Sequence, residues 1–124
     1  MATTDLTKEN FQQIISDNDM VIVDFWASWC GPCKTFAPIF EKVSEQFPDI
    51  VFAKVETDQQ QELASSFQIK SIPTLMIFRE QIIIFSQPGM LPEEPFVEII
   101  GKASALDMDE IRKEVEKQQK EQSS

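Results

Sequence analysis

Residues 21–33 of the 124-residue chain read Val-Ile-Val-Asp-Phe-Trp-Ala-Ser-Trp-Cys-Gly-Pro-Cys, and this stretch decides how the rest is interpreted. The run Val21–Trp26 is rich in β-branched and aromatic residues, which predicts a buried central strand. The only two cysteines, Cys30 and Cys33, follow it. A Cys-x-x-Cys spacing between a strand and a helix places the first sulfur at the helix N-terminus, where unpaired N–H groups and the helix dipole favour a thiolate. The second sulfur is close enough to bond the first, so any chemistry is expected here.

The composition is that of one globular domain, with 42% apolar residues and a formal net charge of −10. Because the basic residues form no long run, we expect no nucleic-acid partner. The N-terminus lacks the pattern of a signal peptide, and no stretch approaches the roughly 20 apolar residues of a membrane span, so we expect a cytoplasmic protein without membrane contact. In that compartment a lone cysteine pair is more often catalytic or metal-binding than structural.

Apolar spacing outlines the remaining elements. Two further strand patterns at 74–78 and 82–85 are too close together for anything but a hairpin, whereas the strand at 50–55 follows a helix and should lie parallel to Val21–Trp26. The predicted sheet is therefore mixed. Helical spacing is found at 9–17, from Cys33 to Phe47 with a kink expected near Pro38, at 59–67, at 92–101 and, more weakly, at 104–120.

The motifs at residues 23–34, Pro38, 53–55, Asp58 and 72–75 together closely resemble the thioredoxin family. The resemblance covers roughly residues 5–103 and divides the chain into a thioredoxin domain at 1–103 and a charged helical extension at 104–124. It implies a three-layer α/β/α fold with a mixed central sheet. It also implies a protein-disulfide reductase, that is, a thiol–disulfide oxidoreductase without a bound cofactor.

The resemblance assigns roles to four catalytic residues. Cys30 would be the attacking thiolate and Cys33 the resolving thiol, which is physically reasonable because Cys30 lies at the exposed helix start and Cys33 one turn inside. Asp24 would be a buried carboxylate that relays a proton to and from Cys33, with Lys54 as its electrostatic partner. Burial should raise the pKa of Asp24 and Lys54 should lower it, and the sequence leaves open which effect is larger. A solvated Asp24 at the end of a strand is the alternative.

The resemblance also implies a substrate-binding surface around Cys30. The Ile72–Pro73 peptide bond would be cis, although the bare pattern fits an ordinary trans proline at a strand start. A proline without an N–H leaves a groove in which an extended client segment can lie against the backbone of Ile72. The apolar collar around Cys30 would consist of Trp29, Gly31, Pro32, Ile72, Pro73, Gly89 and Met90.

Several alternatives remain open at this point. A zinc site needs about four ligands, and the chain has no His and no third Cys, which leaves only a metal or cluster shared between two chains. A purely structural disulfide is another alternative. The Gly31-Pro32 pair and the absence of His resemble reducing members of the family, but a disulfide oxidase or isomerase and a non-enzymatic binding subunit remain alternatives.

The implied partners are disulfide-bearing client proteins and a flavin-dependent NADPH thioredoxin reductase, and we expect a monomer. Two features depart from the family pattern. The segment Arg79-Glu80-Gln81 has no glycine, which predicts a looser or longer hairpin turn. The sparse apolar residues of the tail, Leu106, Met108, Ile111 and Val115, indicate either a solvated helix or a helix that docks on this chain or on a second copy.

Overall fold

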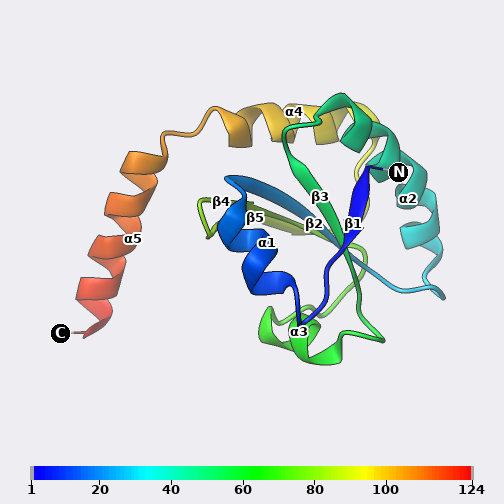
Figure 1. Ribbon diagram of the computed structural model, residues 1–124, viewed down its shortest axis with the longest axis horizontal. Coiled ribbons are helices and arrows are strands. Elements are labelled where there is room, and N and C mark those ends of the chain that lie inside the picture. Colours follow the sequence, from blue (N-terminus) through cyan, green and yellow to red (C-terminus); the bar gives the residue numbers. More distant parts are fainter. Residues whose placement is uncertain (1, 124) are drawn as a thin grey trace.

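Strand β2 (Met20–Trp26) lies at the centre of a five-stranded mixed sheet in the computed structural model, which describes residues 2–123. Figure 1 shows the sheet between helices. Its other strands are β1 (Thr3–Asp5), β3 (Val51–Glu56), β4 (Thr74–Arg79) and β5 (Ile82–Pro88), in the order β1-β3-β2-β4-β5. Strands β1 and β2 both pair parallel with β3, whereas β4 pairs antiparallel with β2 and β5. The mixed sheet, the parallel pair and the hairpin are therefore confirmed.

Within the described residues, five helices connect or follow the strands: α1 (Phe11–Asp17), α2 (Gly31–Gln46), α3 (Gln61–Ser66), α4 (Glu93–Ser104) and α5 (Met108–Ser123). Helix α2 begins directly after Cys30 and continues through Pro38. The expected helices agree with these to within a few residues at most ends. The short edge strand β1 was not predicted, because three residues are too few to display an alternating pattern.

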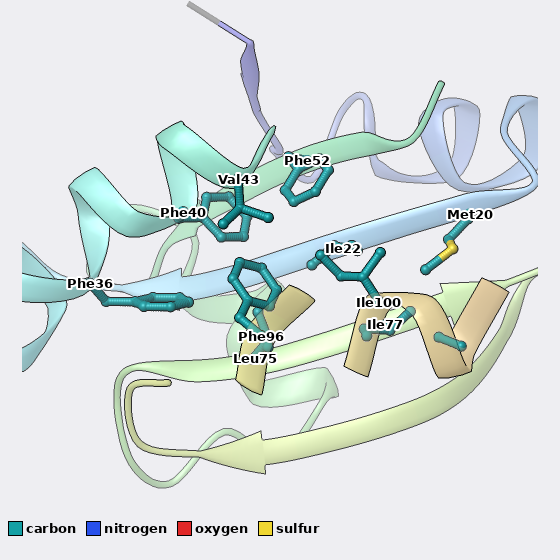
Figure 2. Packing of buried hydrophobic residues seen from close by; sticks show 11 residues of the cluster. Met20, Ile22, Phe36, Phe40, Val43, Phe52, Leu75, Ile77, Phe96 and Ile100 are labelled. Carbon is teal, nitrogen blue, oxygen red and sulfur yellow. The ribbon is translucent and has the colours of Figure 1, made fainter. Parts of the chain in front are cut away.

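One face of the sheet packs against α2 and α4. Figure 2 shows aromatic side chains from both helices meeting over strands β2, β3 and β4. Phe40 of α2 and Phe96 of α4 stack with their ring centroids 5.9 Å apart and an angle of 7° between the rings. Both rings also contact Phe36, so this cluster holds the active-site helix against the sheet.

The opposite face packs against α1 and α3 through a second cluster that includes Ile15 and Leu63. Successive residues of β2 point to opposite faces, so Val23 and Phe25 join this second cluster, whereas Ile22 belongs to the first. By the same alternation Asp24 lies on the face covered by α2. The alternation along β2 thereby places the Asp24 carboxylate beneath α2, the helix that begins directly after Cys30.

The hairpin turn between β4 and β5 differs from the expectation of a looser or longer loop. Arg79 pairs with Ile82, so only Glu80 and Gln81 form the turn, with φ values of 50° and 69°. A two-residue turn with two positive φ values matches the right-handed twist of the strands, and normally contains Asn or Gly. The prediction was wrong because strand pairing, rather than the residue type, sets the length of the turn.

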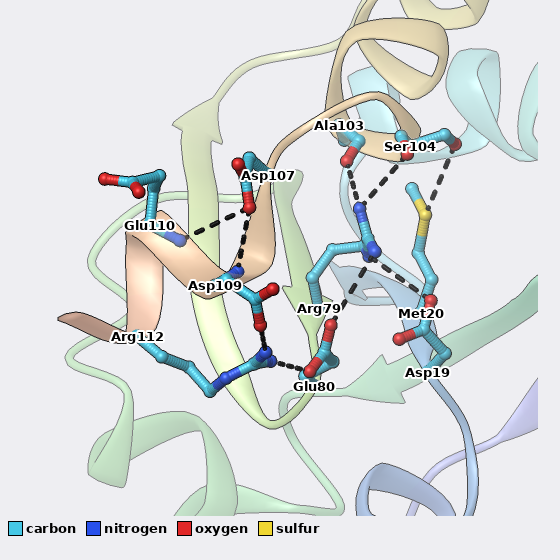
Figure 3. Close-up of polar contacts among 10 residues, drawn as sticks. All are labelled: Asp19, Met20, Arg79, Glu80, Ala103, Ser104, Asp107, Asp109, Glu110 and Arg112. Atoms are coloured by element: carbon cyan, nitrogen blue, oxygen red, sulfur yellow. Dashed lines mark hydrogen bonds and ion pairs between the residues drawn. The ribbon is translucent and has the colours of Figure 1, made fainter. Parts of the chain in front are cut away.

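Helix α5 extends away from the sheet toward the C-terminus (Figure 1). Its first residue, Met108, is 4% exposed, Ile111 and Val115 are half-buried, and the residues from 116 to 122 are exposed. Arg112 forms an ion pair with Glu80 of the hairpin turn (Figure 3). The start of the tail therefore docks on this chain.

Candidate active site

Cys30 is the N-cap residue of α2, with an extended backbone at φ −88° and ψ 114°. Cys30 and Cys33 form a disulfide with their Cα atoms 5.2 Å apart. The backbone N–H of Cys33 donates to Cys30 Sγ at 3.2 Å. A donor of this kind, together with the positive end of the helix dipole, stabilises negative charge on Cys30 once the disulfide is reduced.

The expected difference in exposure between the two cysteines is absent in the disulfide form, since Cys30 is 4% and Cys33 2% exposed. Their surroundings differ instead. Cys30 Sγ lies 3.7 Å from the carbonyl oxygen of Ile72, on the side of the β4 loop. Cys33 lies within the first turn of α2, on the buried side of the helix. The two sulfurs are therefore distinguished by their neighbours rather than by the fraction of their surface that is exposed.

The loop before β4 approaches Cys30 through a cis peptide bond between Ile72 and Pro73. This geometry is the one that the family resemblance implied. The N–H of Gly89 donates to the carbonyl oxygen of Pro73 at 2.8 Å, and Gly89 has φ 93°, a conformation that side chains rarely adopt. This hydrogen bond thus holds Gly89 and Pro73 together.

Trp29 is the largest exposed apolar side chain of the collar, at 68% exposure. Its indole N–H donates to Asp58 Oδ2 at 2.9 Å, which fixes the ring on the surface beside the disulfide. Gly31 and Pro32 are exposed, Ile72 and Met90 are half-buried, and Pro73 is buried. The sequence motif contained Asp58 without indicating this contact, because a hydrogen bond between residues so far apart has no local signal.

A groove of about 190 Å³ lies between Trp29, the residue before Cys30, and Ile72, whose carbonyl oxygen is 3.7 Å from Cys30 Sγ. Its lining consists of Trp29, Thr57, Ala64, Ile69, Lys70, Ser71 and Ile72. Of these, Thr57, Ala64, Ile69, Lys70 and Ser71 were missed in the sequence, where they look like ordinary residues of a helix and a loop. Only the folding of the α3 segment and the β4 loop against Trp29 brings them together.

Asp24 is completely buried, and neither of its carboxylate oxygens has a hydrogen-bond partner in the described structure. Burial raises the pKa of Asp24 from 3.8 to about 7, and the nearby Lys54 opposes this rise. Desolvation is therefore the larger of the two opposing effects. A carboxyl group with this pKa exchanges a proton near neutral pH.

Lys54 is paired with Asp24 in the register of β2 and β3, and both side chains leave the same face of the sheet. The Lys54 ammonium group lies 4.8 Å from the centroid of the Trp26 ring, a cation–π distance. Among residues 2–123, no ion pair within 4.0 Å joins it to Asp24. Lys54 thus acts on Asp24 as a neighbouring charge and not through direct contact.

No group of three or more His, Cys, Asp or Glu side chains within residues 2–123 is arranged to hold a metal ion. None of the helices in this range combines the length and the apolar composition needed to cross a membrane.

Comparison with known proteins places this site in a family. The thioredoxin family model matches residues 2–102. A protein of Streptomyces coelicolor described as putative thioredoxin 2 is 58% identical over 118 residues, which cover 95% of this chain and 88% of the relative. This alignment is longer than the part of the chain before residue 103, so it extends into the tail.

Solved structures agree with the sequence match. A mutant thioredoxin of Halobacterium salinarum superposes with a TM-score of 0.78 at 31% identity and covers 85% of this chain and 93% of its own. Plasmodium falciparum thioredoxin gives a TM-score of 0.75 at 35% identity over 81% of this chain and 98% of its own. The chain belongs to the thioredoxin family and is a thiol–disulfide oxidoreductase, a protein-disulfide reductase that works through the redox-active pair Cys30 and Cys33.

Proposed function

We propose that Cys30 is the nucleophile, Cys33 the resolving thiol and Asp24 the group that takes the Cys33 proton. The observation that carries this assignment is the asymmetry around the two sulfurs. Cys30 caps α2 next to the cis-proline loop and the exposed Trp29, whereas Cys33 lies on the side of α2 that faces the sheet and its buried carboxyl. A client segment that lies along the Ile72 backbone therefore meets Cys30 first.

The exchange then takes two balanced steps. The Cys30 thiolate attacks one client sulfur, the client disulfide breaks, and the other client sulfur leaves as a thiolate that takes a proton from water. Asp24 next removes the proton of Cys33, and the Cys33 thiolate attacks Cys30 Sγ. The client sulfur that was bound to Cys30 leaves as a thiolate. The client has then gained two electrons, and the Cys30–Cys33 disulfide has formed.

The pKa of Asp24 suits this role. A carboxyl group that titrates at about 7 is partly ionised at neutral pH and can accept a proton, and it returns the proton when the disulfide is reduced again. Lys54 favours the ionised form of Asp24 and so keeps the base available. Both residues act beneath the site, without contact with the client.

The collar residues form the client surface. We assign this surface to Trp29, Gly31, Pro32, Ile72, Pro73, Gly89 and Met90. The exposed Trp29 supports the assignment, because exposed apolar surface of this kind is a docking site for protein segments. The Ile72 carbonyl beside Cys30 can accept a backbone hydrogen bond from an extended client chain.

We further propose a cytoplasmic monomer that is reduced by a flavin-dependent NADPH thioredoxin reductase. Its thioredoxin domain comprises residues 1–103 and its extension residues 104–124. The net charge of −10 supports the absence of a nucleic-acid partner. The match of the family model to residues 2–102 supports the domain boundary.

Two measurements test the proposal. The first is the equilibrium of the cysteine pair against glutathione, where a reductase has a potential near the thioredoxin value of about −270 mV and an oxidant lies near −120 mV. A potential well above about −200 mV would contradict a reductase.

The second measurement is trapping with a disulfide-bonded client such as insulin. The Cys33→Ser variant should accumulate a mixed disulfide with the client, because Cys30 attacks and nothing resolves the product. The Cys30→Ser variant should reduce no insulin and should trap none. A mixed disulfide that accumulates on Cys30→Ser instead would reverse the two roles.

A further inference from the structure

The groove between Trp29 and Ile72 contains one charged side chain, Lys70. The other lining residues are Trp29, Ile69, Ile72, Ala64 and the two hydroxyl residues Thr57 and Ser71. Trp29 and Ile72 also border the disulfide, so a client segment that lies along the Ile72 backbone to reach Cys30 passes along this groove. Its side chains then come close to the ammonium group of Lys70.

The positive charge of Lys70 is not neutralised by the protein. Lys70 is exposed, and among residues 2–123 no carboxylate lies within 4.0 Å of its ammonium group. Asp58, the acidic residue in contact with Trp29, uses Oδ2 to accept the indole N–H. The groove therefore offers an available cation between the two residues, Trp29 and Ile72, that also neighbour Cys30.

This cation stands out against the charge of the whole chain. With 21 acidic and 11 basic residues, the protein repels acidic clients at long range. A lysine without an ion-pair partner, in the groove that Trp29 and Ile72 border, acts on a bound client at short range, where salt screens it less than the distant charges. The charge in the groove is thus opposite in sign to the net charge of the protein.

We propose that Lys70 is a specificity-determining residue that binds a carboxylate side chain of the client close to its target cysteine. A strand rises about 3.3 Å per residue and the groove is short, so the preferred carboxylate lies within about two or three residues of that cysteine. This inference rests on the proposed function, because it specifies which disulfides the Cys30 site reduces fastest.

The test compares peptide disulfides that differ only in the residues next to the cysteine. Peptides with Glu, Gln or Lys at each of the neighbouring positions are reduced by the intact chain, and kcat/KM is measured at low and high salt. The Glu peptide should react about two- to five-fold faster than the Gln peptide at the favoured position, the size of effect expected from an exposed ion pair. The preference should shrink at high salt.

Charge variants identify the residue responsible. With Lys70→Gln, the Glu and Gln peptides should have the same kcat/KM. With Lys70→Glu, the Lys peptide should become the preferred substrate. Lys102→Gln and Lys102→Glu are the matched controls, since Lys102 is an exposed lysine beside a separate cavity formed with Ile84, Phe85 and Ile99. These controls should retain the wild-type ratio.

The outcomes separate this inference from the proposed function. A ratio that survives Lys70→Gln, or that Lys102→Gln reduces equally, would overturn the role of Lys70. A wild-type chain that reduces all the peptides at one rate would overturn it as well, while leaving the reductase intact. A chain that reduces none of them would contradict the proposed function itself.

Discussion

Asp24 links the pH dependence of folding to that of catalysis. Its pKa in the folded protein is about 7, against 3.8 for an ordinary aspartate, because burial disfavours its charged form. Between these two values the folded protein holds a proton that the unfolded chain has lost, so stability falls as the pH rises through this window. Above about pH 7 both states are ionised and the loss, up to about 4 kcal/mol, is complete.

We predict that Asp24→Asn stabilises the protein at high pH. The amide cannot ionise, so at about pH 8 the variant should be more stable than the wild type by up to about 4 kcal/mol, and the two should converge near about pH 4. Urea unfolding at several pH values measures this. Asp49→Asn, at an exposed loop position, is the control and should follow the wild-type curve. Parallel curves for wild type and Asp24→Asn would show that Asp24 is ionised in the fold at all these pH values.

We also predict that Asp24→Asn slows the resolving step. Without a base beneath Cys33, release of the reduced client at about pH 7 should slow at least ten-fold, because general-base catalysis contributes at least that much. The deficit should diminish toward about pH 9, where a cysteine thiol ionises unaided. Rapid-quench kinetics of the mixed disulfide provide the measurement. A variant that resolves at the wild-type rate from about pH 6 to 9 would remove Asp24 from the proton relay.

The β4–β5 hairpin holds two non-glycine residues in a left-handed conformation. Two contacts outside the turn support it. The N–H of Glu80 donates to the carbonyl oxygen of Asp19 at 2.7 Å, and the Glu80 carboxylate pairs with Arg112 of α5. Next to the turn, Arg79 donates to the carbonyl oxygens of Ala103 and Ser104 at the end of α4, as Figure 3 shows. The turn therefore depends on neighbouring elements for its conformation.

We predict that Gln81→Gly stabilises this hairpin. Glutamine at φ 69° is strained by contact of its Cβ with the backbone, whereas glycine adopts this conformation freely. The free energy of unfolding should rise by about 0.5–1 kcal/mol, and the melting temperature by a few degrees. Gln87→Gly, in the exposed part of strand β5, is the matched control and should lower stability. Equal losses in both variants would show that residue 81 is unstrained.

Across the whole molecule, sequence patterns predicted the features that depend on residues close together in the chain. The β2 run indicated a central strand, and its alternation placed Asp24 on the face under α2. The tight hairpin turn escaped prediction because pairing of Arg79 with Ile82 overrides the preference for glycine. The groove escaped it because Trp29 and Lys70 meet only after the sheet has formed.

The contacts of the tail could not be predicted for the same reason. The spacing of its apolar residues indicated a helix, but it did not indicate which part of the protein this helix packs against. In the structure Met108 is buried and Arg112 reaches the hairpin turn, so α5 joins elements that are far apart in the sequence. The alignment with the Streptomyces coelicolor relative extends into this segment. The first two turns of α5 therefore belong to the folded body, although the family model ends at residue 102.

We predict that deletion of all residues after Ala105 destabilises the protein without slowing disulfide reduction. Loss of the buried Met108 and of the Arg112–Glu80 pair should lower the free energy of unfolding by about 1–2 kcal/mol, and the melting temperature by about 3–8 °C. A chain that ends at Glu116 keeps both contacts and should melt close to the full chain. Insulin reduction should be unchanged in both, because no described residue of the tail lines the groove or belongs to the cluster around the cysteines. Equal melting temperatures for the two truncations would mean that residues 106–116 contribute nothing to the stability of the fold. A change in sedimentation on deletion would instead assign the tail to an interface between two copies.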